Sequence, residues 1–119
     1  MDRLNPVARK EKPVTCPFCD DAVPRPVVIP QRPEATGGRC SCGAVFISDV
    51  TGKGGGQAVV DGLALLCDND VDRGMGLSAG VDYEVKKLGY RPQTHAAEPH
   101  MPGHGAFGRP KLWFFRLLS

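Results

Sequence analysis

Two closely spaced pairs of cysteines constrain this chain more than any other feature. Two residues separate Cys16 from Cys19 and one separates Cys40 from Cys42, with twenty residues between the pairs. A tight turn between paired cysteines points both sulfurs to one side, and its backbone N–H groups stabilise the thiolate charge. Two such turns that face each other supply four thiolates, the ligand set of a tetrahedral zinc site. We therefore expect these four cysteines to hold one structural Zn²⁺.

The residues around the cysteines favour the same interpretation. Pro17 stiffens the first turn, and Gly43 can adopt a positive φ directly after the second pair. The prolines at 24, 26, 30 and 33 restrict the intervening segment to edge strands or loops, which would form a hairpin that brings the pairs together. So small a unit has a thin core, and metal binding contributes roughly 10–16 kcal/mol to the folding of comparable zinc units.

On these residues the segment 14–50 resembles the zinc-ribbon family. Cys16, Cys19, Cys40, Cys42 and Gly43 carry the resemblance, which covers about a third of the 119 residues. The usual second turn of a ribbon has two residues between its cysteines, whereas Ser41 stands alone here. The resemblance implies a small antiparallel β unit with a structural metal. It also implies binding to nucleic acid or to a protein assembly more than catalysis.

Composition limits what the rest of the chain can form. The chain has 119 residues, of which 41% are hydrophobic and 24% charged, as in ordinary globular proteins. That length allows one compact domain or a small module with extensions. No apolar run reaches the about 18 residues that a membrane-spanning helix needs, and the first residues lack the apolar stretch of a secretory signal. We therefore expect a cytoplasmic protein without membrane contact, in which reduced thiols bind metal.

Charge does not identify a partner. The net charge of +2 is too close to neutral to argue for nucleic acid. The two ends of the chain are basic, and residues 61–72 carry four aspartates before the first cation, Arg73. We expect most of these charges to be solvated surface.

The pattern along the chain predicts an α+β fold in four segments. These are a flexible arm at 1–13, a zinc ribbon at 14–50, a helical segment at 51–95, and a loop with an irregular aromatic C-terminal extension at 96–119. Apolar residues recur at helical spacing over 57–67 and predict one helix. Asp70 could cap a second short helix at 71–78, and 82–88 reads as a short strand or a turn of helix.

The C-terminal segment contains the densest aromatic cluster, Trp113, Phe114 and Phe115, beside Arg116. Aromatic faces beside cations suit single-stranded nucleic acid, and they also suit a protein interface. A third alternative is a last strand that packs Trp113 and Phe115 on the core.

A redox alternative exists for the first cysteine pair. The stretch 14–19 is similar to the motif of glutaredoxins, in which Cys16 would be the nucleophile and Cys19 its resolving thiol. That family needs a helix directly after the motif to lower the thiol pKa. Pro24 and Pro26 interrupt any such helix.

Other metal-ligating residue types lie outside the four-cysteine set. Cys67 falls on the apolar face of the expected helix, where we expect it to pack in the core. His95, His100 and His104 lie in a loop rich in proline and glycine, and whether they bind a second metal stays open.

Taken together, these features predict a zinc-ribbon protein that is not an enzyme. We expect it to act as a protein-binding adaptor or as a small subunit of a larger assembly. The alternative is a nucleic-acid-binding zinc ribbon, and a thiol oxidoreductase using Cys16 and Cys19 is the third hypothesis.

Overall fold

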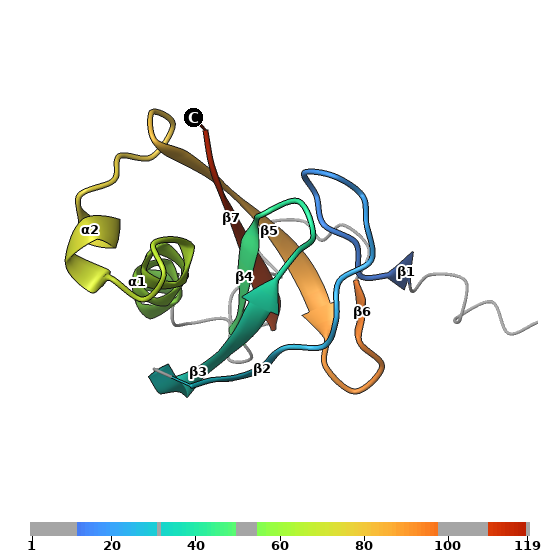
Figure 1. The fold of residues 1–119 in the computed structure, drawn as a ribbon. Helices are drawn as coiled ribbons and strands as arrows, with labels where there is room; N and C mark the ends of the chain where they lie inside the picture. Colours follow the sequence, from blue (N-terminus) through green and yellow to red (C-terminus); the bar gives the residue numbers. More distant parts are fainter. Residues whose placement is uncertain (1–11, 31, 50–54, 98–109, 119) are drawn as a thin grey trace, which may run out of the picture.

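The fold is an antiparallel sheet with two short helices on one side (Figure 1). The computed structural model describes residues 12–30, 32–49, 55–97 and 110–118. In the described residues, neighbouring strands of the sheet are antiparallel, and the seven strands lie in the order β1-β6-β5-β7-β4-β3-β2. The strands are β1 (Lys12–Pro13), β2 (Val27–Ile29), β3 (Arg32–Arg39), β4 (Val45–Asp49), β5 (Tyr83–Arg91), β6 (Ala96–Ala97) and β7 (Lys111–Leu117), and the helices are α1 (Gly55–Leu66) and α2 (Val71–Met75). The expected α+β class is therefore confirmed.

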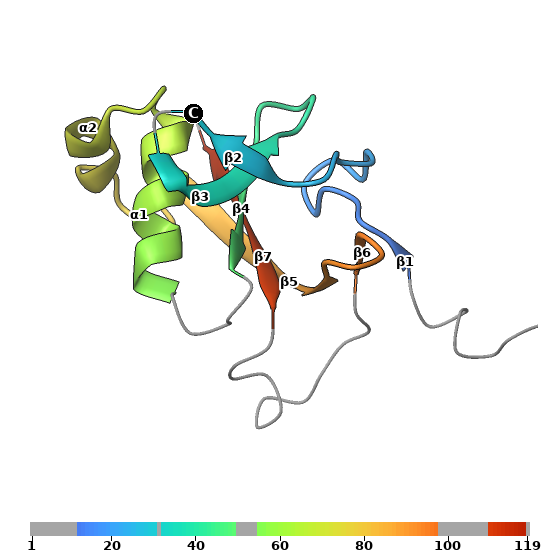
Figure 2. The same cartoon turned by 90° about the horizontal axis from the view of Figure 1, so that it is seen from below.

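The helices form where the sequence predicts them. Helix α1 covers most of the expected 57–67, and it packs against β4 and β7 (Figure 2). Asp70 caps α2 as expected, because its Oδ1 accepts a hydrogen bond from the backbone N–H of Arg73 at 3.0 Å. In the described parts of the chain, the longest helix has only 12 residues and none is long and apolar enough to cross a membrane.

The aromatic end differs from the irregular extension that the sequence predicts. Residues 111–117 form β7, which lies between β4 and β5 in the sheet. Strand β7 is buried on both faces, so its aromatic run is continuous instead of alternating with polar residues. Phe114 faces the cysteine loops, and Phe115 faces α1. Of the three alternatives for this segment, packing in the core is the one that the structure bears out.

Strands from all four expected segments share this sheet, and β1 comes from the end of 1–13. Strands β2, β3 and β4 come from 14–50, β5 from 51–95, and β6 and β7 from 96–119. Strand β2 is an edge strand, as its flanking prolines predict. The expected arm lies largely outside the described residues, and only its end is seen, where β1 pairs with β6.

Two hydrophobic clusters lie on opposite faces of the sheet. The cluster under α1 includes Val45, Ile47 and Phe115. The cluster on the other face includes Phe46 and Phe114, whose ring centroids are 5.4 Å apart. The second cluster also contains Cys16 and Cys40, so the sheet provides the floor on which the cysteine loops rest.

Gly62 of α1 lies against the ring of Phe115 in β7, and it offers a test of this packing. A Cβ added at Gly62 would overlap the ring of Phe115, which has no exposed surface. Gly62→Ala should therefore lower the free energy of unfolding by about 1–2 kcal/mol, although alanine improves helix propensity by about 1 kcal/mol. Gly56→Ala, in the same helix and with open space around the added Cβ, should instead raise stability by about 0.5 kcal/mol. Denaturant unfolding of both variants checks this, and equal effects would contradict the observed packing.

Candidate metal centre

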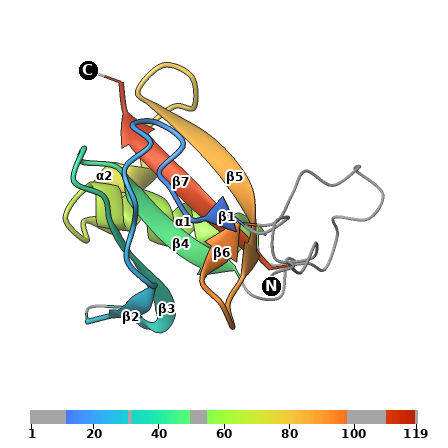
Figure 3. The ribbon, with the colours of Figure 1, turned by 90° about the vertical axis from the view of Figure 1, so that its right-hand side faces the viewer.

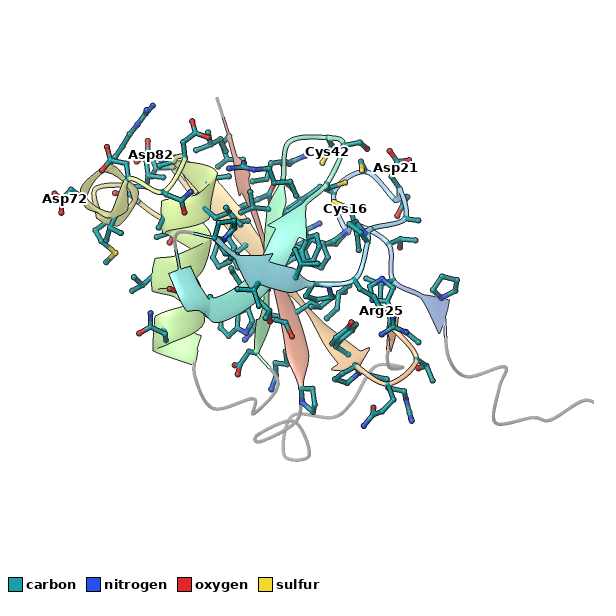
Figure 4. The ribbon with its side chains drawn as sticks, turned by 60° about the horizontal axis from the view of Figure 1, so that its bottom comes forward. Cys16, Asp21, Arg25, Cys42, Asp72 and Asp82 are labelled. Carbon is teal, nitrogen blue, oxygen red and sulfur yellow. The ribbon has the colours of Figure 1, made fainter. Side chains whose placement is uncertain are left out.

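The two cysteine loops meet at one end of the sheet, on the face opposite α1. Figure 4 shows Cys16 and Cys42 close together beside Asp21, whereas Asp72 of α2 lies at the far side of the molecule. The first loop connects β1 to β2, and the second connects β3 to β4. The pairing of β2 with β3 brings the two loops together, as the hairpin expectation requires.

The two loops have the same backbone hydrogen bonds, but the second loop is shorter by one residue. In the first, the carbonyl of Cys16 accepts from the N–H of Asp20 at 2.7 Å, and the N–H of Cys16 donates to the carbonyl of Asp21 at 2.8 Å. In the second, the carbonyl of Cys40 accepts from the N–H of Gly43 at 3.0 Å, and its N–H donates to the carbonyl of Ala44 at 2.8 Å. The single residue between Cys40 and Cys42 is thus accommodated by a tighter turn of the same kind.

Each loop also turns through a left-handed residue directly after its second cysteine. Gly43 has φ +98°, which confirms the positive φ predicted for it, and Asp20 has φ +67° at the matching place in the first loop. Aspartate tolerates this conformation better than most residues with a side chain. The conformation at Asp20 was not predicted, although an aspartate after the second cysteine is compatible with it.

The four sulfurs converge. All four Sγ atoms lie within 4.8 Å of one another, with 3.8 Å between Cys16 and Cys42 and 3.5 Å between Cys19 and Cys40. A disulfide would need about 2.05 Å, whereas a tetrahedron with zinc–sulfur bonds of about 2.3 Å has edges of about 3.8 Å. The cluster could therefore hold a metal ion. Each of the two short Sγ–Sγ distances joins a cysteine of the first loop to a cysteine of the second.

Neighbouring groups hold the two loops in register. The hydroxyl of Ser41 donates to Oδ2 of Asp21 at 2.8 Å, which links the second loop to the first. The backbone N–H of Phe18 points at Sγ of Cys16 at 3.4 Å, an arrangement that stabilises a thiolate. Cys16 and Cys40 are buried, whereas Cys42 is exposed. The site therefore lies at the surface with its inner half against the core.

The thiols influence one another's ionisation. Burial raises the pKa of Cys16, and the nearby thiols of Cys40 and Cys42 raise it further against the effect of backbone N–H groups. The N–H of Asp21 lowers the pKa of Cys19, but burial and the three other thiols together raise it to about 12. Burial disfavours the Cys40 thiolate, yet the N–H of Cys42 and the surrounding thiols outweigh burial and lower the pKa of Cys40. A metal ion would have to displace the protons that the other thiols retain.

Two cations face the first loop from the sheet. The guanidinium of Arg116 lies 4.5 Å, and Nζ of Lys86 5.3 Å, from the ring centroid of Phe18. These distances allow cation–π contacts. A divalent ion with four thiolates keeps an excess of negative charge, which cations on this side of the sheet would partly offset. Phe18 and the two cations are not visible as site residues in the sequence, since they meet only when β5 and β7 pair.

The remaining candidate ligands lie elsewhere or have other partners. Cys67 is buried just after α1 and does not belong to the four-cysteine cluster. Nε2 of His95 donates to the carbonyl of Val23, and its Nδ1 accepts from the hydroxyl of Tyr90, both at 2.8 Å. Burial raises the pKa of Tyr90 against the opposing charge of Arg25, so its hydroxyl remains available as the donor. Both ring nitrogens of His95 are therefore engaged.

The other two histidines of the question left open by the sequence, His100 and His104, lie outside the described residues. His95 instead fastens the turn between β5 and β6 to the segment that follows the first cysteine loop. Arg25 reinforces the same junction through a hydrogen bond from Nη1 to the carbonyl of Pro92 at 2.8 Å.

Comparisons with known proteins give no relative for this fold and site. No protein-family description, no curated protein and no solved structure matches the chain.

Proposed function

We propose that this chain is a zinc-ribbon-like adaptor that binds one structural Zn²⁺ through Cys16, Cys19, Cys40 and Cys42. The observation that carries the proposal is the convergence of four sulfurs from two loops of the same hydrogen-bonding pattern. Four thiolates complete the coordination of Zn²⁺ and leave no open position for a substrate, which favours a structural role over a catalytic one. Soft thiolate ligands also accept iron, so the identity of the ion is part of the test.

In this proposal the metal fixes the cysteine loops, and the loops with the sheet present a surface to a protein partner or a larger assembly. Thiolate ligands must remain reduced, which fits the cytoplasm.

The thiol oxidoreductase is disfavoured because it needs a helix directly after the first cysteine pair. Within the described residues, the first helix after Cys19 is α1, which begins only at Gly55. Burial and neighbouring thiols also raise the pKa of Cys16, which is the opposite of what a nucleophilic thiol requires.

Elemental analysis of the purified full chain tests the metal. We expect about one zinc per chain, because the cluster offers a single set of four thiolates. Iron in place of zinc would change the proposed identity of the ion and leave the proposed four-cysteine site unchanged. Metal-free protein with rapid thiol–disulfide exchange at Cys16 would reject the proposal in favour of the oxidoreductase.

A salt titration separates a protein partner from nucleic acid. Affinity for single-stranded nucleic acid should fall steeply with salt because counterions are released on binding. Binding that depends on apolar contacts and backbone hydrogen bonds should change far less. Tight binding of nucleic acid with a steep salt dependence would make the chain a nucleic-acid-binding module.

A further inference from the structure

Among the described residues, strand β5 has one edge that is paired along most of its length and one edge that is paired only at its end. Strand β7 pairs with it from Tyr83 to Gly89. On the opposite edge, β6 pairs only with Tyr90 and Arg91. Across the described parts of the chain, no other named strand pairs with that edge, and Figure 3 shows β5 as the margin of the sheet with β6 near its end. An uncovered edge of this length can accept a further strand.

The hydrogen bonds at the two ends of β5 show which residues face this free edge. The N–H of Tyr90 donates to the carbonyl of Pro110, directly before β7, at 3.1 Å, so Tyr90 points its backbone groups toward β7. At the other end, the carbonyl of Tyr83 accepts from the N–H of Gly80 at 2.8 Å and so points away from β7. Backbone direction alternates along a strand. The odd-numbered residues between them therefore point outward.

The outward residues are Val85, Lys87 and Gly89, each with one N–H and one C=O at the free edge. Helix α1 packs on β4 and β7, which leaves the Val85 side chain 38% exposed beside this edge. Gly89 has no side chain to obstruct a neighbouring backbone. The edge thus combines unpaired polar backbone with an exposed apolar side chain, the two features that strand addition uses.

Charge around the edge indicates what kind of strand would bind. Lys86 and Lys87 are exposed and project to opposite faces of the sheet, one toward Phe18 and the other toward Trp113, at 4.9 Å from the Trp113 ring centroid. Neither lysine forms an ion pair with a described residue, whereas the nearby Glu84 is paired with Arg116. Both faces of the edge therefore carry a cation that has no carboxylate partner among the described residues.

We propose that the free edge of β5 binds an extended acidic segment of a partner protein by antiparallel or parallel strand addition. This inference rests on the proposed role as a protein-binding adaptor and names the contact surface. Carboxylates on a strand beside β5 would meet Lys86 and Lys87, and its backbone would pair with the outward groups of Val85, Lys87 and Gly89. A second copy of this chain fits less well, since two β5 edges would bring like charges together.

The probe is a blocked synthetic peptide as long as the Tyr83–Gly89 stretch that β6 leaves open. It carries adjacent glutamates between valines, so that its carboxylates project to both faces of the sheet. It is titrated into the isotopically labelled full chain, used as purified, while amide resonances are followed. We expect shifts centred on Val85, Lys87 and Gly89, together with slower hydrogen exchange at these amides. The same peptide with lysine in place of glutamate should bind at least about tenfold more weakly, because each face of the edge would then repel it.

Modified peptides and variants test the backbone contacts separately. N-methylation of the peptide residues that face β5 should weaken binding by about tenfold for each hydrogen bond lost, whereas N-methylation of the alternate residues should not. Lys87→Pro removes an outward N–H and should weaken binding to a similar degree. Lys87→Ala keeps that N–H and should weaken binding only about threefold. The peptide pair needs no altered protein, so a folding defect in the proline variant cannot obscure the result.

Several outcomes would overturn this proposal. They are absence of binding by the acidic peptide, shifts that centre away from β5, equal binding of the lysine peptide, self-association through β5, and displacement of the peptide by single-stranded DNA. The metal content is measured on the same sample. Zinc without peptide binding rejects the edge proposal alone, whereas peptide binding without any metal rejects the zinc proposal and keeps the edge.

Discussion

Cys40→Ser is expected to release the metal and to unfold the cysteine loops. Cys40 is 6% exposed, its Sγ lies 3.5 Å from that of Cys19, and it belongs to the hydrophobic cluster that also contains Phe46 and Phe114. We expect the free energy of unfolding to fall by on the order of 5 kcal/mol, a part of the roughly 10–16 kcal/mol that metal binding contributes to zinc-dependent folding. A loss of that size approaches the whole stability of a typical domain. Metal content and thermal unfolding of the full chain measure it.

The matched control is Cys67→Ala, which also removes a buried thiol. Cys67 is 7% exposed but lies outside the four-cysteine cluster. This variant should retain its metal and lose only about 1 kcal/mol, the usual cost of a point substitution. The account fails if Cys40→Ser keeps metal and native melting temperature, or if both variants lose metal alike.

Phe115→Ala is expected to lower the free energy of unfolding by about 3–5 kcal/mol, the cost of emptying an aromatic site in a core. The ring of Phe115 has no exposed surface, packs against Gly62 of α1, and lies 6.4 Å between centroids from the ring of Tyr83. It therefore joins the helix to the central strand of the sheet. Denaturant unfolding of the metal-saturated protein measures this loss.

Leu117→Ala provides the comparison within the same strand. Leu117 is paired with Tyr83 and is 41% exposed, so truncating it should cost less than about 1 kcal/mol. Similar losses for the two variants would mean that β7 is not held in the sheet through Phe115. If Phe115→Ala lowers the free energy of unfolding only slightly, the C-terminal segment would instead be the irregular extension that the sequence predicts.

Local patterns in the sequence predicted the features that depend on neighbouring residues. The spacing of the cysteines predicted which side chains converge, the prolines around β2 predicted an edge strand, and Gly43 predicted the positive φ. The helical spacing before Cys67 predicted α1, and Asp70 predicted the cap of α2. Each of these depends on steric or hydrogen-bonding rules that act within a few residues.

Features that depend on distant pairing could not be predicted in the same way. The aromatic run at 111–117 becomes the strand between β4 and β5 only because Val45 and Val85 both lie beside Phe115. Register between strands far apart in sequence is set by the complete core, and a single sequence does not reveal it. For the same reason the sequence shows Gly62 only as a residue that destabilises a helix. In the structure, its missing side chain leaves room for the ring of Phe115.

The surroundings of the cysteines are also products of tertiary structure. Lys86 and Arg116 reach the ring of Phe18 because β5 and β7 pair beneath the first loop. Ser41 reads as a departure from the usual spacing, yet its hydroxyl links the second loop to Asp21. Hydrogen bonds between loops of this kind have no local sequence pattern.

X-ray absorption at the zinc edge of the purified full chain tests the central claim most directly. Four sulfur neighbours at about 2.3 Å, with no nitrogen or oxygen in the first coordination sphere, is the result that we predict. A mixed set of nitrogen, oxygen and sulfur ligands would contradict the four-cysteine site, and a chain purified without zinc or another metal would contradict the structural role of the ion.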